Sequence, residues 1–183
     1  MHQRGFTLIE ILVVLVIISV IVSMAAINTG NDPRIKELSA EAQRLRFVLE
    51  DLSEQALFRN TDIGFVANKS EISFYEYIAT PANPNNLNQE ETFTWQLSQQ
   101  KVSNPFKLTQ ESMTLSLSVE GLSVVLPFSG TQDDKEIEPQ FFAYSSGEQD
   151  VTLFEISIDD LERVSTVKGM GVGRYYTGVK DEP

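Results

Sequence analysis

The sequence contains no cysteine and only one histidine, His2, among its 183 residues. Without cysteine the fold has no disulfide, and nothing indicates the redox compartment of the protein. Beyond position 2 there is no Cys–His or Ser–His pair for nucleophilic catalysis and no nitrogen or sulfur ligand set for zinc. We therefore expect no enzymatic activity, no cofactor and no metal site.

Positive charge is also scarce. The chain has 14 lysines and arginines against 26 acidic residues, which gives a net charge of −12. Its most basic stretch, from Arg34 to Arg46, has glutamates between the basic residues. A nucleic-acid-binding surface needs a basic patch, so we expect no nucleic-acid partner.

Long apolar runs are absent except for one near the N-terminus. Residues 11–27 are apolar apart from Ser19 and Ser23. Counted from Phe6, the segment has 22 residues, and a helix of that length is about 33 Å long, enough to span a bilayer core. One carboxylate, Glu10, lies within it. An ionisable group in a membrane span costs roughly 2.5–3.5 kcal/mol, which makes Glu10 a candidate functional residue.

The residues from Gly5 to Glu10, Gly-Phe-Thr-Leu-Ile-Glu, resemble the processing site of type IV pilins and of the pseudopilins of type II secretion. The resemblance implies that residues 1–5 form a leader, which a prepilin peptidase removes between Gly5 and Phe6. It also implies that the same enzyme N-methylates Phe6 and that Glu10 neutralises the new amino terminus of a neighbouring subunit. A plain secretory signal would need an Ala-x-Ala-like site after its apolar core, and residues 23–26, Ser-Met-Ala-Ala, only loosely imitate one.

The resemblance also implies a location and a set of partners. It places residues 6–27 in the inner membrane of a Gram-negative cell as a single-pass helix, with residues 28–183 in the periplasm. The basic residues on the two sides of the span do not by themselves favour this orientation. The implied partners are the prepilin peptidase/N-methyltransferase, the major pseudopilin, other minor pseudopilins, the inner-membrane assembly platform and membrane lipid.

A helix stop and restart follows the apolar run. Asp32 is placed to act as an N-cap and Pro33 as the first residue of a new helix, after Gly30. Whether one bent helix or two helices result stays open.

After this break, apolar residues recur at alternating spacings of three and four, which predicts an amphipathic helix over about 34–58. The stripe consists of Ile35, Leu38, Ala42, Leu45, Leu49, Leu52 and Ala56, widened by Phe47, Val48 and Leu57.

We expect this stripe to pack on the domain's own sheet. A self-associating coiled coil is a second interpretation of the heptad spacing. A third is a shared role, in which the upper half of the stripe contacts neighbouring subunits and the lower half contacts the core.

Alternating strands with turn residues between them predict β-hairpins over about 62–177. The predicted pairs are 63–67 with 71–78, 113–119 with 122–126, 140–144 with 151–158, and 163–167 with 173–177. Residues 93–97 form one further strand, and 80–92 and 129–139 are polar loops. A long N-terminal helix, half transmembrane and half amphipathic, packed on antiparallel hairpins gives an α+β fold.

Segments within residues 28–183 narrow the resemblance to one branch of the pseudopilins. The C-terminal half of the H-type minor pseudopilins, GspH, is similar to the Ser-Ser-Gly-Glu turn at 145–148 and the strand Thr-Leu-Phe-Glu-Ile-Ser-Ile at 152–158. The helix end of the same family resembles residues 54–60. Many type IV pilins close a C-terminal loop with a disulfide, which this chain cannot form. The resemblance implies a low-copy subunit of the type II secretion pseudopilus, which helps export folded proteins across the outer membrane.

Two other functions stay open. One is a minor type IV pilin acting in adhesion, motility or DNA uptake, although the acidic charge balance argues against DNA uptake. The other is a membrane-tethered enzyme, for which no residue set suggests a reaction.

Four acidic residues could offer oxygen ligands to calcium, but without an EF-hand pattern a solvated acidic loop is the simpler interpretation. They are Asp133, Asp134, Glu136 and Glu138.

Overall fold

The computed structural model describes residues 8–28, 32–80, 92–98, 105–128 and 137–181, with side chains described except at 23–28, Thr80 and Asp181. The chain divides into two compact units, Met1–Lys36 and Glu37–Pro183. The predicted polar loops at 80–92 and 129–139 lie mostly outside the described residues.

The first unit contains α1, which runs from Leu8 to Asn28. Between residues 8 and 22 its leucine, isoleucine and valine side chains are 49–84% exposed. Within the described residues, no helix combines the length and apolar character of a membrane span. The predicted span at 6–27 is therefore not confirmed and stays a prediction.

A second helix, α2, runs from Pro33 to Arg59 and matches the helix predicted at about 34–58. Asp32 caps it as predicted: its carboxylate accepts a hydrogen bond from the Arg34 backbone N at 2.9 Å, and its backbone oxygen accepts one from the Ile35 N at 3.0 Å. These bonds satisfy donors that a helix start leaves without intrahelical partners. On the question of one bent helix or two, α1 is described as far as Asn28, Asp32 is not helical and α2 begins at Pro33, while residues 29–31 lie outside the described residues.

The predicted stripe of α2 is the helix's contribution to the core. Its residues from Leu38 to Ala56 are 0–1% exposed, and they form one cluster with the buried side chains of the strands. The interpretation that the stripe packs on the domain's own sheet is therefore confirmed. Two residues expected to widen the stripe do not: Phe47 is 69% and Leu57 51% exposed.

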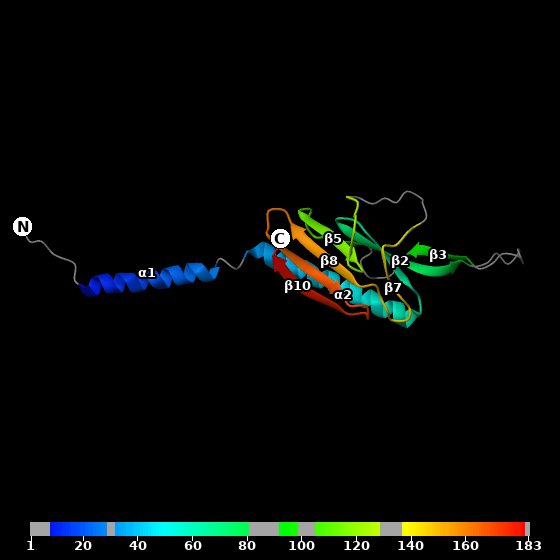
Figure 1. Cartoon of the computed structure of the whole chain (residues 1–183), viewed down its shortest axis with the longest axis horizontal. Helices are drawn as coiled ribbons and strands as arrows, with labels where there is room; N and C mark the ends of the chain where they lie inside the picture. The colour runs from blue at the N-terminus through cyan, green and yellow to red at the C-terminus, as the bar shows by residue number, and fades with distance from the viewer. Residues whose placement is uncertain (1–7, 29–31, 81–91, 99–104, 129–136, 182–183) are drawn as a thin grey trace, which may run out of the picture. The chain divides into compact units, whose positions relative to one another are not determined.

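Ten strands in the described part of the chain form two antiparallel sheets, which lie along α2 (Figure 1). Sheet A has the order β3-β2-β1-β7, and the short β4 also pairs with β2. Its strands are β1 (Ile63–Ala67), β2 (Glu71–Thr80), β3 (Thr92–Leu97), β4 (Phe106–Lys107) and β7 (Phe141–Ala143). Sheet B has the order β10-β9-β8-β5-β6. Its strands are β5 (Met113–Val119), β6 (Leu122–Val124), β8 (Thr152–Ile158), β9 (Arg163–Gly169) and β10 (Tyr175–Asp181).

Three of the four predicted hairpins are confirmed. In two of them the turn residues stabilise the reversal of the chain. Between β1 and β2, the Asn68 side chain accepts hydrogen bonds from the backbone N atoms of Ser70 and Glu71 at 2.8 and 2.9 Å. Between β5 and β6, Glu120 and Gly121 both have positive φ, 51° and 79°, as a two-residue hairpin turn requires. The pair β9 and β10 is antiparallel as well.

The hairpin predicted from 140–144 and 151–158 is wrong. The turn between these segments forms, since the Tyr144 N donates to the Glu148 O at 2.8 Å. The strands, however, separate into different sheets: β7 pairs with β1, and β8 pairs with β5 and β9. The Asp150 carboxylate accepts the Phe142 N–H at 2.8 Å, so a side chain takes the donor that a continued ladder would use.

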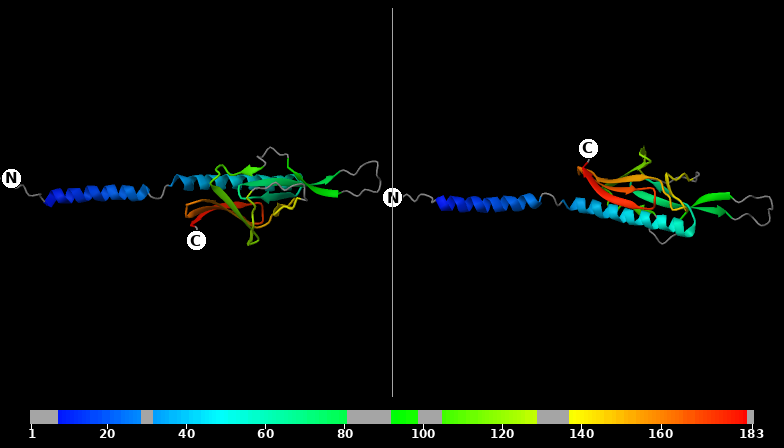
Figure 2. Two further views of the ribbon diagram at one scale, coloured as in Figure 1. Left: turned by 90° about the horizontal axis from the view of Figure 1, so that it is seen from above. Right: turned by 60° about the horizontal axis from the view of Figure 1, so that its bottom comes forward.

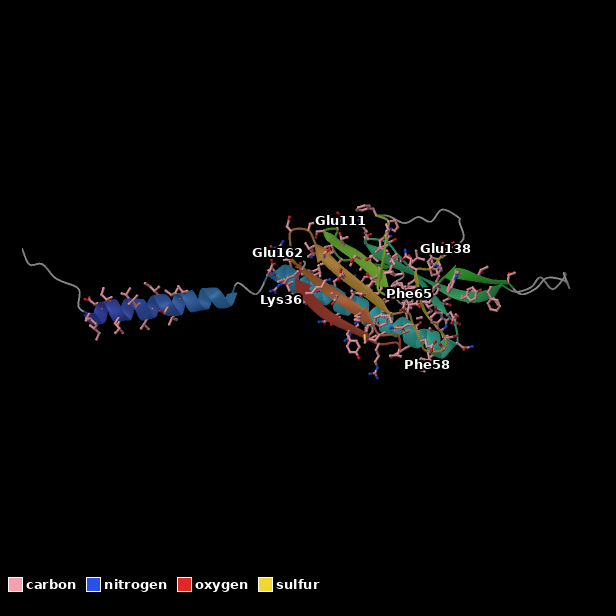
Figure 3. All side chains as sticks on the ribbon, viewed as in Figure 1. Lys36, Phe58, Phe65, Glu111, Glu138 and Glu162 are labelled. Atoms are coloured by element: carbon pink, nitrogen blue, oxygen red, sulfur yellow. The ribbon has the colours of Figure 1, made fainter. Side chains whose placement is uncertain are left out.

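Aromatic rings join the two sheets inside the core. Phe65 of β1 stacks on Phe141 of β7, with ring centroids 4.3 Å apart, and meets Phe74 of β2 edge-on at 5.7 Å. Phe141 in turn meets Phe154 of β8 at 5.4 Å, which links sheet A to sheet B. In Figure 3 Phe65 lies among these interior side chains, whereas Phe58 lies at the C-terminal end of α2, where it is 83% exposed.

The burial of α2 generates a testable prediction. Leu49→Asp places a charge at a position with 0% exposure, and we expect a loss of roughly 4 kcal/mol in the free energy of unfolding, or no folding at all. Phe47→Asp, two residues away on the exposed side, is the matched control and should cost little. Urea unfolding of the full chain in detergent, followed by near-ultraviolet circular dichroism, measures both. Equal stability of the two variants would mean that Leu49 is not part of the core.

Candidate functional site

The residues predicted to carry processing and assembly lie at the N-terminus. Gly5 and Phe6 are outside the described residues, so cleavage and methylation stay predictions. Glu10 lies in the first turn of α1 and is the acidic residue of that turn. A carboxylate is favoured there because the unpaired N–H groups give a helix start partial positive charge.

The surroundings of Glu10 on its own helix are apolar. From Ile11 to Val22 the polar side chain is Ser19, whose hydroxyl donates to the Leu15 backbone oxygen at 2.8 Å and is satisfied within the helix. From Leu8 to Val22, Glu10 is therefore the charged group among side chains that are apolar or, at Ser19, bonded within the helix. Such a group can fix the position of a partner by charge, where apolar contacts alone would let helices slide.

A buried carboxylate that the sequence analysis missed ties α2 to the segment after β4. Glu41 is 4% exposed, and its oxygens accept hydrogen bonds from the Thr109 backbone N and hydroxyl, each at 3.2 Å. Arg44 forms an ion pair with Glu41, and its guanidinium lies 4.0 Å above the Phe106 ring. The arrangement is fully paired and lies inside the fold, so we interpret it as structural.

The outward face of sheet A carries a row of aromatic rings, the second feature that the sequence analysis missed. We call it the aromatic stripe and define it as Tyr77, Phe93, Trp95, Phe142 and Tyr144. Neighbouring centroids are 4.8–5.9 Å apart, and the interplanar angles are 25–42°. The signal in the sequence is the period of two: the inward residues of β2 and β7 are buried, and the aromatic ones between them point the other way.

Gly64 makes the stripe continuous. It is paired with Tyr75 of β2 and Phe142 of β7, at the centre of sheet A. A Cβ atom at this position would lie 2.9 Å from the Trp95 ring and 2.5 Å from the Pro139 ring. Because Gly64 has no side chain, Trp95 reaches across from β3 and its ring comes within 5.6 Å of the Phe142 ring, centroid to centroid.

Carboxylates surround the Tyr144 end of the stripe. Asp150 lies 3.5 Å from the Tyr144 hydroxyl, and Asp62 accepts the Ser145 N–H at 2.7 Å. Burial raises the pKa of Tyr144, and the negative charges of Asp150, Asp62 and Glu148 raise it further. Burial likewise raises the pKa of Asp150. No lysine or arginine forms an ion pair with these three carboxylates in the described part of the chain.

No group of three or more histidine, cysteine, aspartate or glutamate residues that could hold a metal ion occurs among the described residues. Of the four acidic residues considered for calcium, only Glu138 is described, and it is exposed. Asp133, Asp134 and Glu136 lie outside the described ranges, so calcium binding by this loop stays untested.

Comparison with known proteins identifies the family. A family model described as the prokaryotic N-terminal methylation motif matches residues 1–26. The chain is 30% identical to type II secretion system protein H of Pseudomonas aeruginosa over 151 residues, which are 80% of this chain and 78% of the relative. The chain belongs to the family of type II secretion system protein H. The H-type resemblance seen in its sequence is thereby confirmed.

Solved structures bear out the fold of this H-family chain. The crystal structure of the minor pseudopilin EpsH from the type II secretion system of Vibrio cholerae matches with a TM-score of 0.55 and 21% identity, over 78% of this chain and 93% of that one. The solution structure of E. coli GspH matches with a TM-score of 0.55 and 14% identity, over 81% and 92%. The predicted α+β pseudopilin fold is therefore confirmed.

Proposed function

We propose that the chain is a minor pseudopilin, a structural subunit of the type II secretion pseudopilus that helps export folded proteins across the outer membrane. The observation that carries this proposal is the 30% identity to a type II secretion system protein H over 80% of the chain. The methylation motif at residues 1–26 supports it independently. No catalytic constellation was found in the sequence, which fits a structural role.

The processing step acts on the first residues of the chain. A prepilin peptidase/N-methyltransferase cleaves the leader 1–5 between Gly5 and Phe6 and methylates Phe6. Residues 6–27 then anchor the subunit in the inner membrane, and residues 28–183 fold in the periplasm. The exposed apolar side chains of α1 between residues 8 and 22 support this placement, since a helix that is apolar all round needs apolar surroundings.

Assembly follows from the charge of Glu10. One helical turn separates it from the Phe6 amine of its own chain, and a neighbouring subunit brings an equivalent amine. Lipid gives helices little hydrophobic reason to associate, so the pair between the Glu10 carboxylate and a neighbour's amino terminus supplies both attraction and register. The subunits that Glu10 meets are the major pseudopilin and other minor pseudopilins, assembled on the inner-membrane platform.

The function is tested by deleting the gene. We expect the secreted proteins to reach the periplasm and accumulate there, because the proposed role begins after export across the inner membrane. Fractionation of culture supernatant and periplasm measures this, and a plasmid copy of the gene should restore secretion. Normal secretion in the deletion strain, with loss of twitching or DNA uptake instead, would identify the chain as a minor type IV pilin.

Processing is tested at the glycine. Gly5→Ala adds a methyl group where the peptidase must approach the backbone, and we expect cleavage to be blocked or slowed. Mass spectrometry of the N-terminus measures the products, with N-methyl-Phe6 expected for the unmodified sequence. Gln3→Ala, within the same leader, is the control and should be cleaved normally. A mature N-terminus at any other residue would contradict the assignment.

The role of Glu10 is tested in the same deletion strain. Glu10→Val removes the charge but leaves an apolar helix, so we expect normal cleavage with a strong reduction in co-purified partner subunits. Ser19→Val is the matched control, because the Ser19 hydroxyl is bonded within α1 and its loss should leave assembly intact. If Glu10→Val supports secretion and co-purification as well as the unmodified protein, the charge has no part in assembly.

A further inference from the structure

The aromatic stripe is not used by the core or by the proposed assembly of α1. It lies on the face of sheet A opposite the buried residues Phe65 and Phe74. Figure 2 shows that β2 and β3 extend beyond the C-terminal end of α2. Tyr77 remains 40% and Phe93 51% exposed although their rings stack. Contiguous exposed apolar surface of this kind marks interaction sites.

The rings and carboxylates of the aromatic stripe favour a positively charged partner. Aromatic faces attract cations through their negative quadrupole, and Asp62, Glu148 and Asp150 add negative charge at the Tyr144 end. Asp150 uses one carboxylate oxygen for the Phe142 N–H, while the other lies at the Tyr144 hydroxyl. Negative charge beside exposed rings is complementary to arginine and lysine, and of the two arginine stacks better on rings.

The chain itself is a poor source of such a partner. Its net charge is −12, so a second copy would bring further negative charge. The internal segments outside the described residues that flank β3 and β7 are 81–91, 99–104 and 129–136. Their sequences contain two lysines, Lys101 and Lys135, but no arginine, which is the better partner for aromatic rings. A neutral sugar would leave the three carboxylates without a charge partner. The complementary occupant is therefore a basic polypeptide from another protein.

We propose that the aromatic stripe, with the carboxylates of Asp62, Glu148 and Asp150 at its Tyr144 end, binds an extended, arginine-bearing segment of a partner protein. Arginine side chains lie against the rings, and the guanidinium group nearest Tyr144 pairs with the carboxylates. Gly64 has a positioning role, because it lets Trp95 connect the rings of β2 and β3 with those of β7. The proposal does not depend on how the N-terminus is processed.

The stripe contains its own reporter. Trp95 is the single tryptophan of the chain and lies at the centre of the stripe, between Tyr77 and Phe142. The probe is a six-residue peptide of alternating arginine and serine, titrated into the full chain in detergent micelles. We expect a saturable change in Trp95 emission, which weakens as salt is added. A peptide with citrulline in place of arginine has the same shape without the charge and should give no change.

Two variants and two controls separate the stripe from general attraction to an acidic protein. Asp150→Asn keeps an oxygen for the Phe142 N–H but removes the charge, and Tyr144→Ala removes one ring. Each should raise the dissociation constant of the arginine peptide roughly threefold, the size expected for the loss of one exposed charge pair or one exposed charge–ring contact. Asp159→Asn removes the same charge from an exposed turn in sheet B, and Phe128→Ala removes an exposed ring outside the stripe. Both controls should bind normally.

Four results would overturn the proposal. One is no change in Trp95 emission with the arginine peptide, and another is equal weakening by Asp159→Asn and Asp150→Asn. A third is a change in Trp95 emission with the citrulline peptide, or with a neutral hexasaccharide, as large as the change with the arginine peptide. That result would indicate that the surface binds uncharged peptides or sugars. The fourth is a concentration-dependent emission change without peptide, which would indicate a second copy of the chain. Circular dichroism melting curves confirm that each variant is folded.

Discussion

Burial of one face of α2 is the constraint on which both sheets depend. Between Leu38 and Ala56 the stripe residues are almost completely removed from water, and each large side chain buried in this way contributes roughly 1.5–3 kcal/mol. Neither sheet has another described helix to cover its inner face. The phenylalanine cluster built on that face, from Phe65 to Phe154, holds sheet A and sheet B to each other as well as to the helix.

The same alternation that fills the core also produces the outer surface. In β2 and β7 every second residue is buried, so the residues between them must face outward. The outward residues of sheet A include the rings of the aromatic stripe, and Gly64 leaves the space in which Trp95 joins them. Core and aromatic stripe are thus two faces of one set of strands.

Charge has different tasks in the two units of the chain. In α1 a single carboxylate, Glu10, stands among apolar side chains, where its effect on a partner helix is large because little else is polar. In the larger unit, acidic residues are numerous, and most contribute only weakly because water screens them. The carboxylates near Tyr144 differ, since they lie beside rings and have no basic partner in the described residues.

The sequence by itself determined whatever depends on neighbours along the chain: the Asp32 cap, the bounds of α2, the three hairpins closed by local turns, and the motif from Gly5 to Glu10. Tertiary structure decided the rest. It placed β7 and β8 in different sheets, left Phe47 and Leu57 exposed, and paired Glu41 with Thr109. It also assembled the aromatic stripe from three separate stretches of sequence. These outcomes depend on which distant strands pair, and strand pairing is a long-range choice that local periodicity does not encode.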